Sequence, residues 1–149
     1  DPFMALWFSC VYPYESLVEF GSSDEALIRI RPRLDRHTAA CFEEVCRQQV
    51  RQEMSRWGCV RVGRQWGAGY EIDVAGVNES NELAVVGECK WSERPVGVSV
   101  LRELRTKIVD HQLPLAESAQ FVLFAKQGFT PELERVASDD DRLVLASFS

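Results

Sequence analysis

The sequence predicts an α/β domain in which helices flank a mixed β-sheet, preceded by an N-terminal helical segment. From Thr38 onward, helical and strand patterns follow one another in the order α-β-β-β-α-β-α-β. A chain of 149 residues with 46% hydrophobic and 27% charged residues has the size and composition of one globular domain, which excludes a disordered or fibrous protein. We expect residues 1–36 to be a helical extension or linker and residues 37–149 to be the domain itself.

The first 36 residues contain two short helical patterns. Residues 3–12 form a largely apolar and aromatic run, and Pro13 limits any helix there. A run that is apolar on all sides must be buried, against either this domain or a neighbouring part. A short helix over 25–30 follows, and the Pro-containing segment 31–33 is expected to break it.

A long amphipathic helix is predicted over residues 38–57, with Gly58 just beyond its C-terminus. The side chains expected to face inward recur at three- and four-residue spacing: Phe42, Val45, Cys46, Gln49, Val50 and Met54. The side chains expected to face solvent are Glu44, Arg47, Arg51 and Glu53.

Three strands are predicted next. Residues 59–64 alternate as a strand does, and a glycine-containing loop over 65–69 follows. Residues 70–77 and 83–91 are rich in β-forming side chains and are joined by the polar turn 78–82, so they indicate a hairpin.

The last part of the chain alternates between helices and strands. A second amphipathic helix is predicted over 97–112, and the apolar residues 121–125 indicate a buried strand. A helix over 131–138 has Thr130 as its N-cap, and residues 143–146 form the final strand.

The charge pattern limits how the protein could bind nucleic acid. The formal net charge is -6, so long-range attraction to a polyanion is not expected. Residues 37–112 carry eleven acidic and ten basic side chains, however, and one bound divalent cation would make this segment positive. We therefore expect DNA binding to depend on a metal ion.

The cysteines indicate a reducing compartment. Their number is odd, and no pair has the Cys-x-x-Cys spacing of a zinc or redox site. Because no signal peptide or membrane-spanning run is present, we expect a cytoplasmic protein. Without an initiator Met, the chain is expected to be a piece of a longer protein.

The predicted hairpin carries the most informative polar residues. Glu88 and Lys90 lie two residues apart and share a face, and Asp73 lies on the partner strand with Glu71. An Asp and a Glu on neighbouring strands supply the oxygen ligands that Mg²⁺ or Mn²⁺ prefers, and a nearby Lys can stabilise charge on a phosphate. A structural ion pair within the sheet explains the same spacing equally well.

Four segments together resemble the PD-(D/E)XK nuclease-like superfamily. They are Glu-Ile-Asp-Val (71–74), Gly-Glu-Cys-Lys-Trp (87–91), Phe-Glu (42–43) and Val-Gly-Arg-Gln-Trp (62–66). The chain is most similar to the C-terminal domain of archaeal-type (DEXX-box) P-loop ATPases, in which a region similar to residues 1–8 joins the ATPase and winged-helix part to the nuclease-like part. The resemblance covers essentially the whole chain.

The resemblance implies a restriction-endonuclease-like αβββαβ core and a set of site residues. It makes Asp73 and Glu88 the metal ligands, Lys90 the catalytic lysine and Glu43 the helix carboxylate that completes the metal site, with Glu44 as a competitor for that last role. Ile72 stands where the motif name has Pro.

Further basic and aromatic side chains lie near these motifs in the sequence. The candidates for nucleic-acid binding are Arg61, Arg64, Trp66, Trp91, Arg94 and Lys107. The alternative, that the two tryptophans are core or lid residues and the arginines a solvated rim, is favoured, as is an i,i+4 pair between Lys107 and Glu103. The two histidines have no Ser or Cys partner for a catalytic triad, and no P-loop is present, so this fragment has no nucleotide site.

Two functional hypotheses follow. In the first, the domain is a Mg²⁺- or Mn²⁺-dependent endonuclease or phosphodiesterase that acts on DNA. In the second, it is a catalytically silent docking or regulatory domain of the ATPase, which binds nucleic acid or protein. The expected partners are DNA and the ATPase and winged-helix part of the same protein. A second copy of the chain is a further candidate partner, because the apolar segment 3–11 suits a contact surface.

Overall fold

The computed structural model describes residues 1–148 and divides into two compact units. The first is Asp1–Cys41 and the second begins at Phe42. The division falls within one long helix, α3 (Ser23–Gln52).

The first unit consists of helical segments. α1 (Pro2–Leu6) continues into a π-helical turn over Trp7–Val11, a 3₁₀ turn over Tyr12–Tyr14 and α2 (Glu15–Glu19), before α3 begins. Of the apolar run 3–12, Cys10 is buried, whereas five large side chains are exposed: Phe3, Met4, Trp7, Phe8 and Tyr12. The expectation that this run is buried is therefore not met within its own unit.

Helix α3 differs from the prediction at Pro32. The sequence predicts that the segment 31–33 ends a short helix, but α3 continues through Pro32. A proline inside a helix leaves the carbonyl of the residue four positions earlier without its donor. That residue, Ile28, is 73% exposed, so water can satisfy its carbonyl group and the helix can continue.

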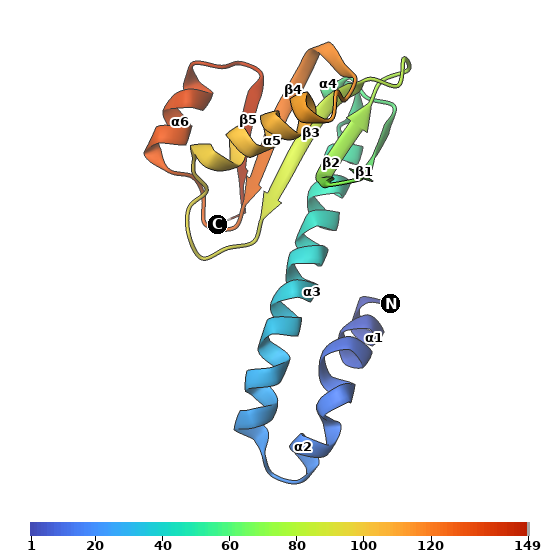
Figure 1. The fold of residues 1–149 in the computed structure, drawn as a ribbon, viewed down its shortest axis with the longest axis vertical. Helices are drawn as coiled ribbons and strands as arrows, with labels where there is room; N and C mark the ends of the chain where they lie inside the picture. Colours follow the sequence, from blue (N-terminus) through green and yellow to red (C-terminus); the bar gives the residue numbers. More distant parts are fainter. Residues whose placement is uncertain (149) are drawn as a thin grey trace. The chain divides into compact units, whose positions relative to one another are not determined.

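The second unit contains a five-stranded mixed sheet with the strands in sequence order. The strands are β1 (Arg61–Gly67), β2 (Tyr70–Val77), β3 (Leu83–Lys90), β4 (Leu115–Ala125) and β5 (Leu143–Ser147). The first three pair in antiparallel fashion, and β3, β4 and β5 pair in parallel through the crossover helices α5 (Val98–Asp110) and α6 (Pro131–Ser138) (Figure 1). The predicted α/β class, the αβββαβ order and the N-terminal helical segment are confirmed.

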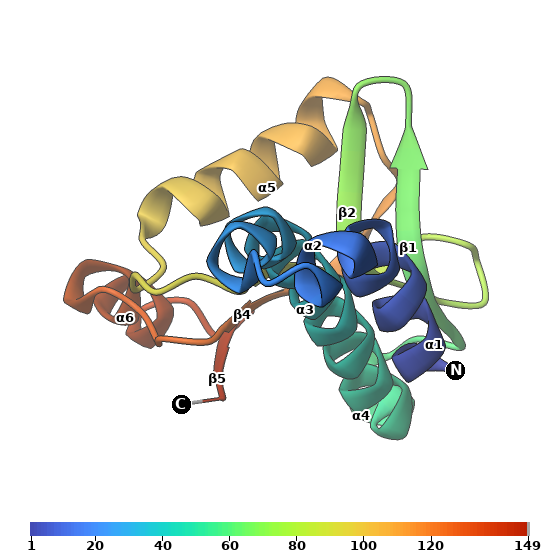
Figure 2. The same cartoon turned by 90° about the horizontal axis from the view of Figure 1, so that it is seen from below.

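Several element ends differ from the prediction. The long helix ends at Gln52, and the short α4 (Met54–Trp57) follows, with Gly58 at its C-cap in a left-handed conformation. β1 extends to Gly67 instead of ending in a loop, because a tight turn containing Gly69 (φ 83°) returns the chain directly into β2. Figure 2 shows β1 and β2 side by side with this connection.

Two hydrophobic cores lie on the two faces of the sheet. One packs Leu101 and Leu104 of α5 and Leu133 of α6 against the strands. The other packs Phe42 and Val50 of α3, with Trp57 of α4, against the opposite side chains. Because both faces are covered, the central strand β3 is buried along almost its whole length, as parallel strands usually are.

Within residues 1–148, no helix is both long enough and apolar enough to cross a membrane. All five cysteines are free thiols: Cys10, Cys41, Cys46, Cys59 and Cys89.

Gly87 is needed for the close packing of β3. A Cβ at this position would lie 2.8 Å from Cγ1 of Val122 and 3.0 Å from Cβ of Val74. We expect Gly87→Ala to lower the free energy of unfolding by about 1–3 kcal/mol through overpacking, as measured by urea denaturation.

The matched control is Gly63→Ala, also in a strand. A Cβ added at Gly63 would meet no atom within 4 Å, so this variant should change stability by less than about 1 kcal/mol. Equal losses in both variants would contradict the packing role of Gly87.

Candidate active site

Strands β2 and β3 part at one end of their ladder, and the predicted acidic residues lie at this fork. The last residue pair between the two strands is Val74 with Gly87. Beyond it, β2 stays paired with β1, while β3 stays paired with β4 through Glu88 and Leu123. Asp73 and Glu88 are thus the first residues past the point where the strands separate.

An irregularity in β2 changes the direction of Asp73. Gly63 pairs with Ala75 and Gln65 pairs with Ile72, so β2 has one residue more than β1 over this stretch. Ile72 consequently belongs to the core beneath α5, whereas Val74 belongs to the core beneath α3. The simple alternation on which the prediction rests does not hold here, because a β-bulge re-aims the side chains that follow it.

The Asp73 carboxylate is held by the backbone of the neighbouring strand. Its Oδ2 accepts a hydrogen bond of 2.8 Å from the N–H of Cys89. Burial and the nearby charge of Glu88 raise the pKa of Asp73 to about 6, although the Cys89 N–H and Lys90 oppose this shift. Glu43 also contributes to the rise, so negative charge accumulates around Asp73 without full compensation.

Glu88 is buried and bound by two lysines. Its Oε1 lies 2.9 Å from Nζ of Lys90, and its Oε2 lies 3.0 Å from Nζ of Lys107 on α5. Lys107 also donates to the carbonyl oxygen of Glu71, 2.9 Å away. The favoured expectation of a Lys107 pair with Glu103 is therefore wrong: the helix packs on the sheet with Lys107 turned toward the fork.

Lys90 carries a positive charge at neutral pH. Burial alone would favour the neutral amine, but the hydrogen bond and the charge of Glu88 outweigh it and raise the pKa of Lys90 above its ordinary value. Lys90 is thus suited to donate hydrogen bonds and to stabilise negative charge rather than to accept a proton.

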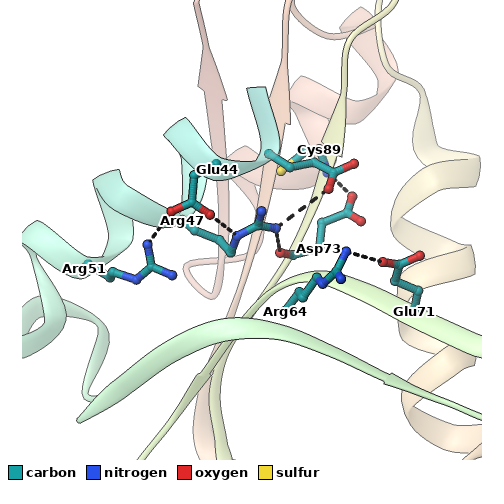
Figure 3. Close-up of polar contacts among 8 residues, drawn as sticks. Glu44, Arg47, Arg51, Arg64, Glu71, Asp73 and Cys89 are labelled. Carbon is teal, nitrogen blue, oxygen red and sulfur yellow. Dashed lines mark hydrogen bonds and ion pairs between the residues drawn. The ribbon is translucent and has the colours of Figure 1, made fainter. Parts of the chain in front are cut away.

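Arg47 is the part of this arrangement that the sequence pattern missed. The pattern places Arg47 in solvent and Val45 inward, yet Arg47 is 8% exposed and Val45 is 48% exposed. Arg47 Nη1 donates to the carbonyl oxygen of Asp73 at 2.8 Å, and its Nε donates to Glu44 at 3.0 Å (Figure 3). A buried guanidinium needs hydrogen-bonding partners. Glu43 and Glu44, four and three residues before Arg47, were therefore the feature of the sequence that could have predicted its burial.

The two candidate helix carboxylates have different surroundings. Glu44 is bound by Arg51 at 2.7 Å and by Arg47, and these hydrogen bonds lower its pKa (Figure 3). Glu43 Oε2 lies 3.7 Å from Arg47, and burial raises its pKa, with Arg47 opposing the rise. The negative charges of Glu71 and Glu88 raise it further, so Glu43, rather than Glu44, belongs electrostatically to the fork.

The acidic side chains at the fork do not form a ready-made metal cage. In the described part of the chain, no three or more His, Cys, Asp or Glu side chains form a group that could hold a metal ion. Glu43, Asp73 and Glu88 influence one another electrostatically but do not form such a group as they stand.

The predicted nucleic-acid-binding residues fall into two sets. Arg64 and Trp66 of β1, Lys107 of α5 and Trp91, which directly follows β3, border the fork. Arg61, by contrast, donates to Asn81 in the turn at the far end of β2, and Arg94 is exposed in the segment after β3. The fold therefore brings the first set to the candidate site but leaves Arg61 away from it.

Cys89 is not suited to act as a nucleophile despite its place beside Glu88. A hydrogen bond with Cys46, together with burial, raises the pKa of Cys89 far above its ordinary value. The thiol is therefore protonated at neutral pH, and nucleophilic chemistry requires the thiolate. The groups available for chemistry at the fork are the carboxylates and the lysines.

The chain belongs to the protein family DUF234. The model of the family DUF234, described as "Archaea bacterial proteins of unknown function", matches residues 7–107, which include the fork residues Asp73, Glu88 and Lys90.

Two further proteins are similar to parts of this chain. The chain is 27% identical over 97 residues to the uncharacterized protein MJECL04 of Methanocaldococcus jannaschii; the match covers 62% of this chain and spans 22% of that relative's length. A repair endonuclease from Pyrococcus abyssi is similar in structure, with a TM-score of 0.43 and 16% identity over 60% of this chain and 37% of that one.

The raised pKa of Asp73 predicts a dependence of stability on pH. Between its ordinary value of 3.8 and about 6, the folded protein retains a proton that the unfolded chain releases, so stability falls as the pH rises through this window. At pH 7 the loss is at most about 3 kcal/mol. Asp73→Asn should remove this slope and stabilise the protein above pH 6, as measured by urea denaturation between pH 4 and 8.

The matched control is Glu71→Gln in the same strand. Glu71 is exposed and forms only a 3.8 Å surface pair with Arg64, so its replacement should change stability by less than about 1 kcal/mol. If the stability of the original protein and of Asp73→Asn changed with pH in the same way, the predicted contribution of Asp73 to the pH dependence would be excluded.

Proposed function

We propose that the second unit is a metal-dependent nuclease-like domain that hydrolyses or binds DNA phosphodiesters. The observation that carries this proposal is the meeting of Asp73 and Glu88 where β2 and β3 separate, with Lys90 and Lys107 on Glu88. Oxygen ligands and cations placed together in this way are the components of metal-assisted phosphodiester hydrolysis. Carboxyl groups whose pKa is shifted by burial and by neighbouring charges, as in Asp73 and Glu43, occur preferentially at functional sites.

The carboxylate chemistry of these residues suits Mg²⁺ or Mn²⁺, although the side chains would have to move closer together to share an ion. These ions prefer carboxylate oxygens, and Mg²⁺ is commonly bound by one or two carboxylates while water and substrate phosphate supply the remaining ligands. Asp73 and Glu88 would hold the ion, and Glu43 would bind it directly or through water. The excess negative charge that raises the pKa of Asp73 and Glu43 supports this assignment, because a cation would relieve it.

A bound ion would supply a water molecule of lowered pKa and would polarise the phosphate. The roles of the protein's own groups follow from their charges. Lys90, which is positively charged and 38% exposed at its side chain, would donate to the attacking water or to a phosphate oxygen. Lys107 would keep Glu88 oriented from α5, and Arg47 would fix the backbone of Asp73.

We further propose that this domain works within a larger ATPase. The M. jannaschii relative is several times longer than the matched segment, which leaves room for further domains in that protein. The exposed aromatic side chains of residues 3–12 suit an apolar contact with another part of such a protein, or with a second copy of the chain.

A second candidate is a docking or regulatory domain that does not cut DNA. The observation favouring it is that both carboxylate oxygens of Glu88 already have a lysine partner. The chain's net charge of -6 also disfavours tight binding to DNA without a metal ion. Metal binding and DNA cleavage, measured separately, distinguish the two candidates.

The first experiment measures metal binding directly. Titration of the protein with MnCl₂ in a calorimeter should give saturable heat, with a Kd between micromolar and millimolar. Asp73→Asn and Glu88→Gln should each weaken binding at least tenfold, because each replaces an anionic ligand by a neutral amide. Glu82→Gln, which replaces an acid in the turn at the far end of the hairpin, is the control and should bind as the original protein does. Absence of saturable heat for the original protein would exclude the proposed site.

The second experiment measures cleavage. The protein should nick supercoiled or branched DNA in Mn²⁺, and Lys90→Ala should reduce the rate at least a hundredfold while it still binds Mn²⁺. Arg135→Ala removes an exposed basic side chain of α6, outside the fork, and should retain the rate. Metal binding with equal background cleavage by the original protein and Lys90→Ala would favour the docking role.

A further inference from the structure

An exposed tryptophan stands on the strand next to the fork. Trp66 lies near the end of β1 and is 66% exposed. The guanidinium of Arg64 lies 5.0 Å above the centre of its ring. The sequence pattern favours a core or lid role for this tryptophan, but its exposure excludes a core role, because a ring of this size normally buries most of its surface.

Arg64 links this aromatic surface to the candidate site. Its Nη1 lies 3.8 Å from Glu71, the residue opposite Trp66 on β2 (Figure 3). The charge of Arg64 also opposes the rise in the pKa of Glu43. Trp66, Arg64 and Glu71 therefore lie on the same side of the sheet as Glu43 of α3, one of the fork carboxylates. A flat apolar ring and a cation that is only weakly held stand beside groups suited to phosphodiester chemistry.

Trp91 provides a second aromatic group on the other arm of the fork. It follows Lys90 directly and packs on Phe42, with a distance of 5.1 Å between ring centres. Nζ of Lys126 lies 4.9 Å from the centre of its ring. Trp66 lies on the arm formed by β1 and β2, and Trp91 directly follows the arm formed by β3.

We propose that the substrate of this site is an unpaired DNA strand, with one base stacked on Trp66 and an adjacent phosphate bound by Arg64. This inference rests on the proposed nucleic-acid function of the same site and names its substrate class. Only an unpaired base exposes a whole face for stacking, because in a duplex both faces are covered by neighbouring base pairs.

The charge of the protein favours the same class of substrate. Binding to a duplex through phosphates alone depends on many basic side chains, and this chain has 17 basic against 23 acidic residues. Stacking adds affinity that does not depend on net charge. A site with few cations and exposed rings therefore discriminates in favour of unpaired bases.

Binding is measured by fluorescence anisotropy in EDTA, so that neither metal binding nor cleavage influences the result. Three labelled probes of equal length are compared: oligo-dT, an abasic oligonucleotide and a blunt duplex. We expect oligo-dT to bind at least fivefold more tightly than either of the others. Trp66→Ala should weaken oligo-dT binding by about 5- to 150-fold, and Trp66→Phe should restore most of it.

Trp7→Ala, which removes an exposed tryptophan of the first unit, serves as the matched control and should bind oligo-dT as the original protein does. Duplex or abasic DNA that binds as tightly as oligo-dT would overturn the inference, as would equal affinity of Trp66→Ala and the original protein. Trp66-dependent binding without any metal-dependent cleavage would uphold this inference while refuting catalysis. Cleavage of duplex DNA that is unaffected by Trp66→Ala would uphold catalysis while refuting this inference.

Discussion

The candidate site depends on the point at which β2 and β3 stop pairing. Past the Val74–Gly87 pair, β2 remains paired with β1 and β3 remains paired with β4, but β2 and β3 no longer pair with each other. The gap exposes backbone and side-chain polar groups inside an otherwise apolar sheet, where unsatisfied groups are costly. Side chains therefore supply the missing hydrogen bonds. The Asp73 carboxylate accepts one from the N–H of Cys89, and Arg47 donates one to the carbonyl oxygen of Asp73.

The two acids at the fork are stabilised to different extents. Glu88 has two lysines within 3.0 Å, whereas Asp73 has a backbone donor and several negative neighbours. One carboxylate is thus paired with cations, while the other titrates near pH 6. Such an imbalance between adjacent carboxyl groups lowers stability, and folded proteins retain it mainly where the unbalanced charge serves a ligand.

Local patterns in the sequence predicted the elements but not every contact between them. The order of helices and strands and the bounds of β2 followed from periodicity, and Asp73, Glu88 and Lys90 could be placed on adjacent strands from spacing. Lys107 and Arg47 reach partners 19 and 26 residues away in the chain, and such contacts depend on how helices pack on the sheet. The bulge at Asp73 and the continuation of α3 through Pro32 likewise reflect tertiary context, which overrides local preference.

The hydrogen bond from Cys89 to Asp73 has a consequence for how the family can vary. The donor is a main-chain N–H, which every residue except proline possesses. Evolution can therefore replace the side chain at position 89, within the limits of the space beside Cys46, without releasing the carboxylate. This contact of the candidate site is in this way encoded by the path of the backbone rather than by the identity of one side chain, and sequence comparison alone would not reveal it.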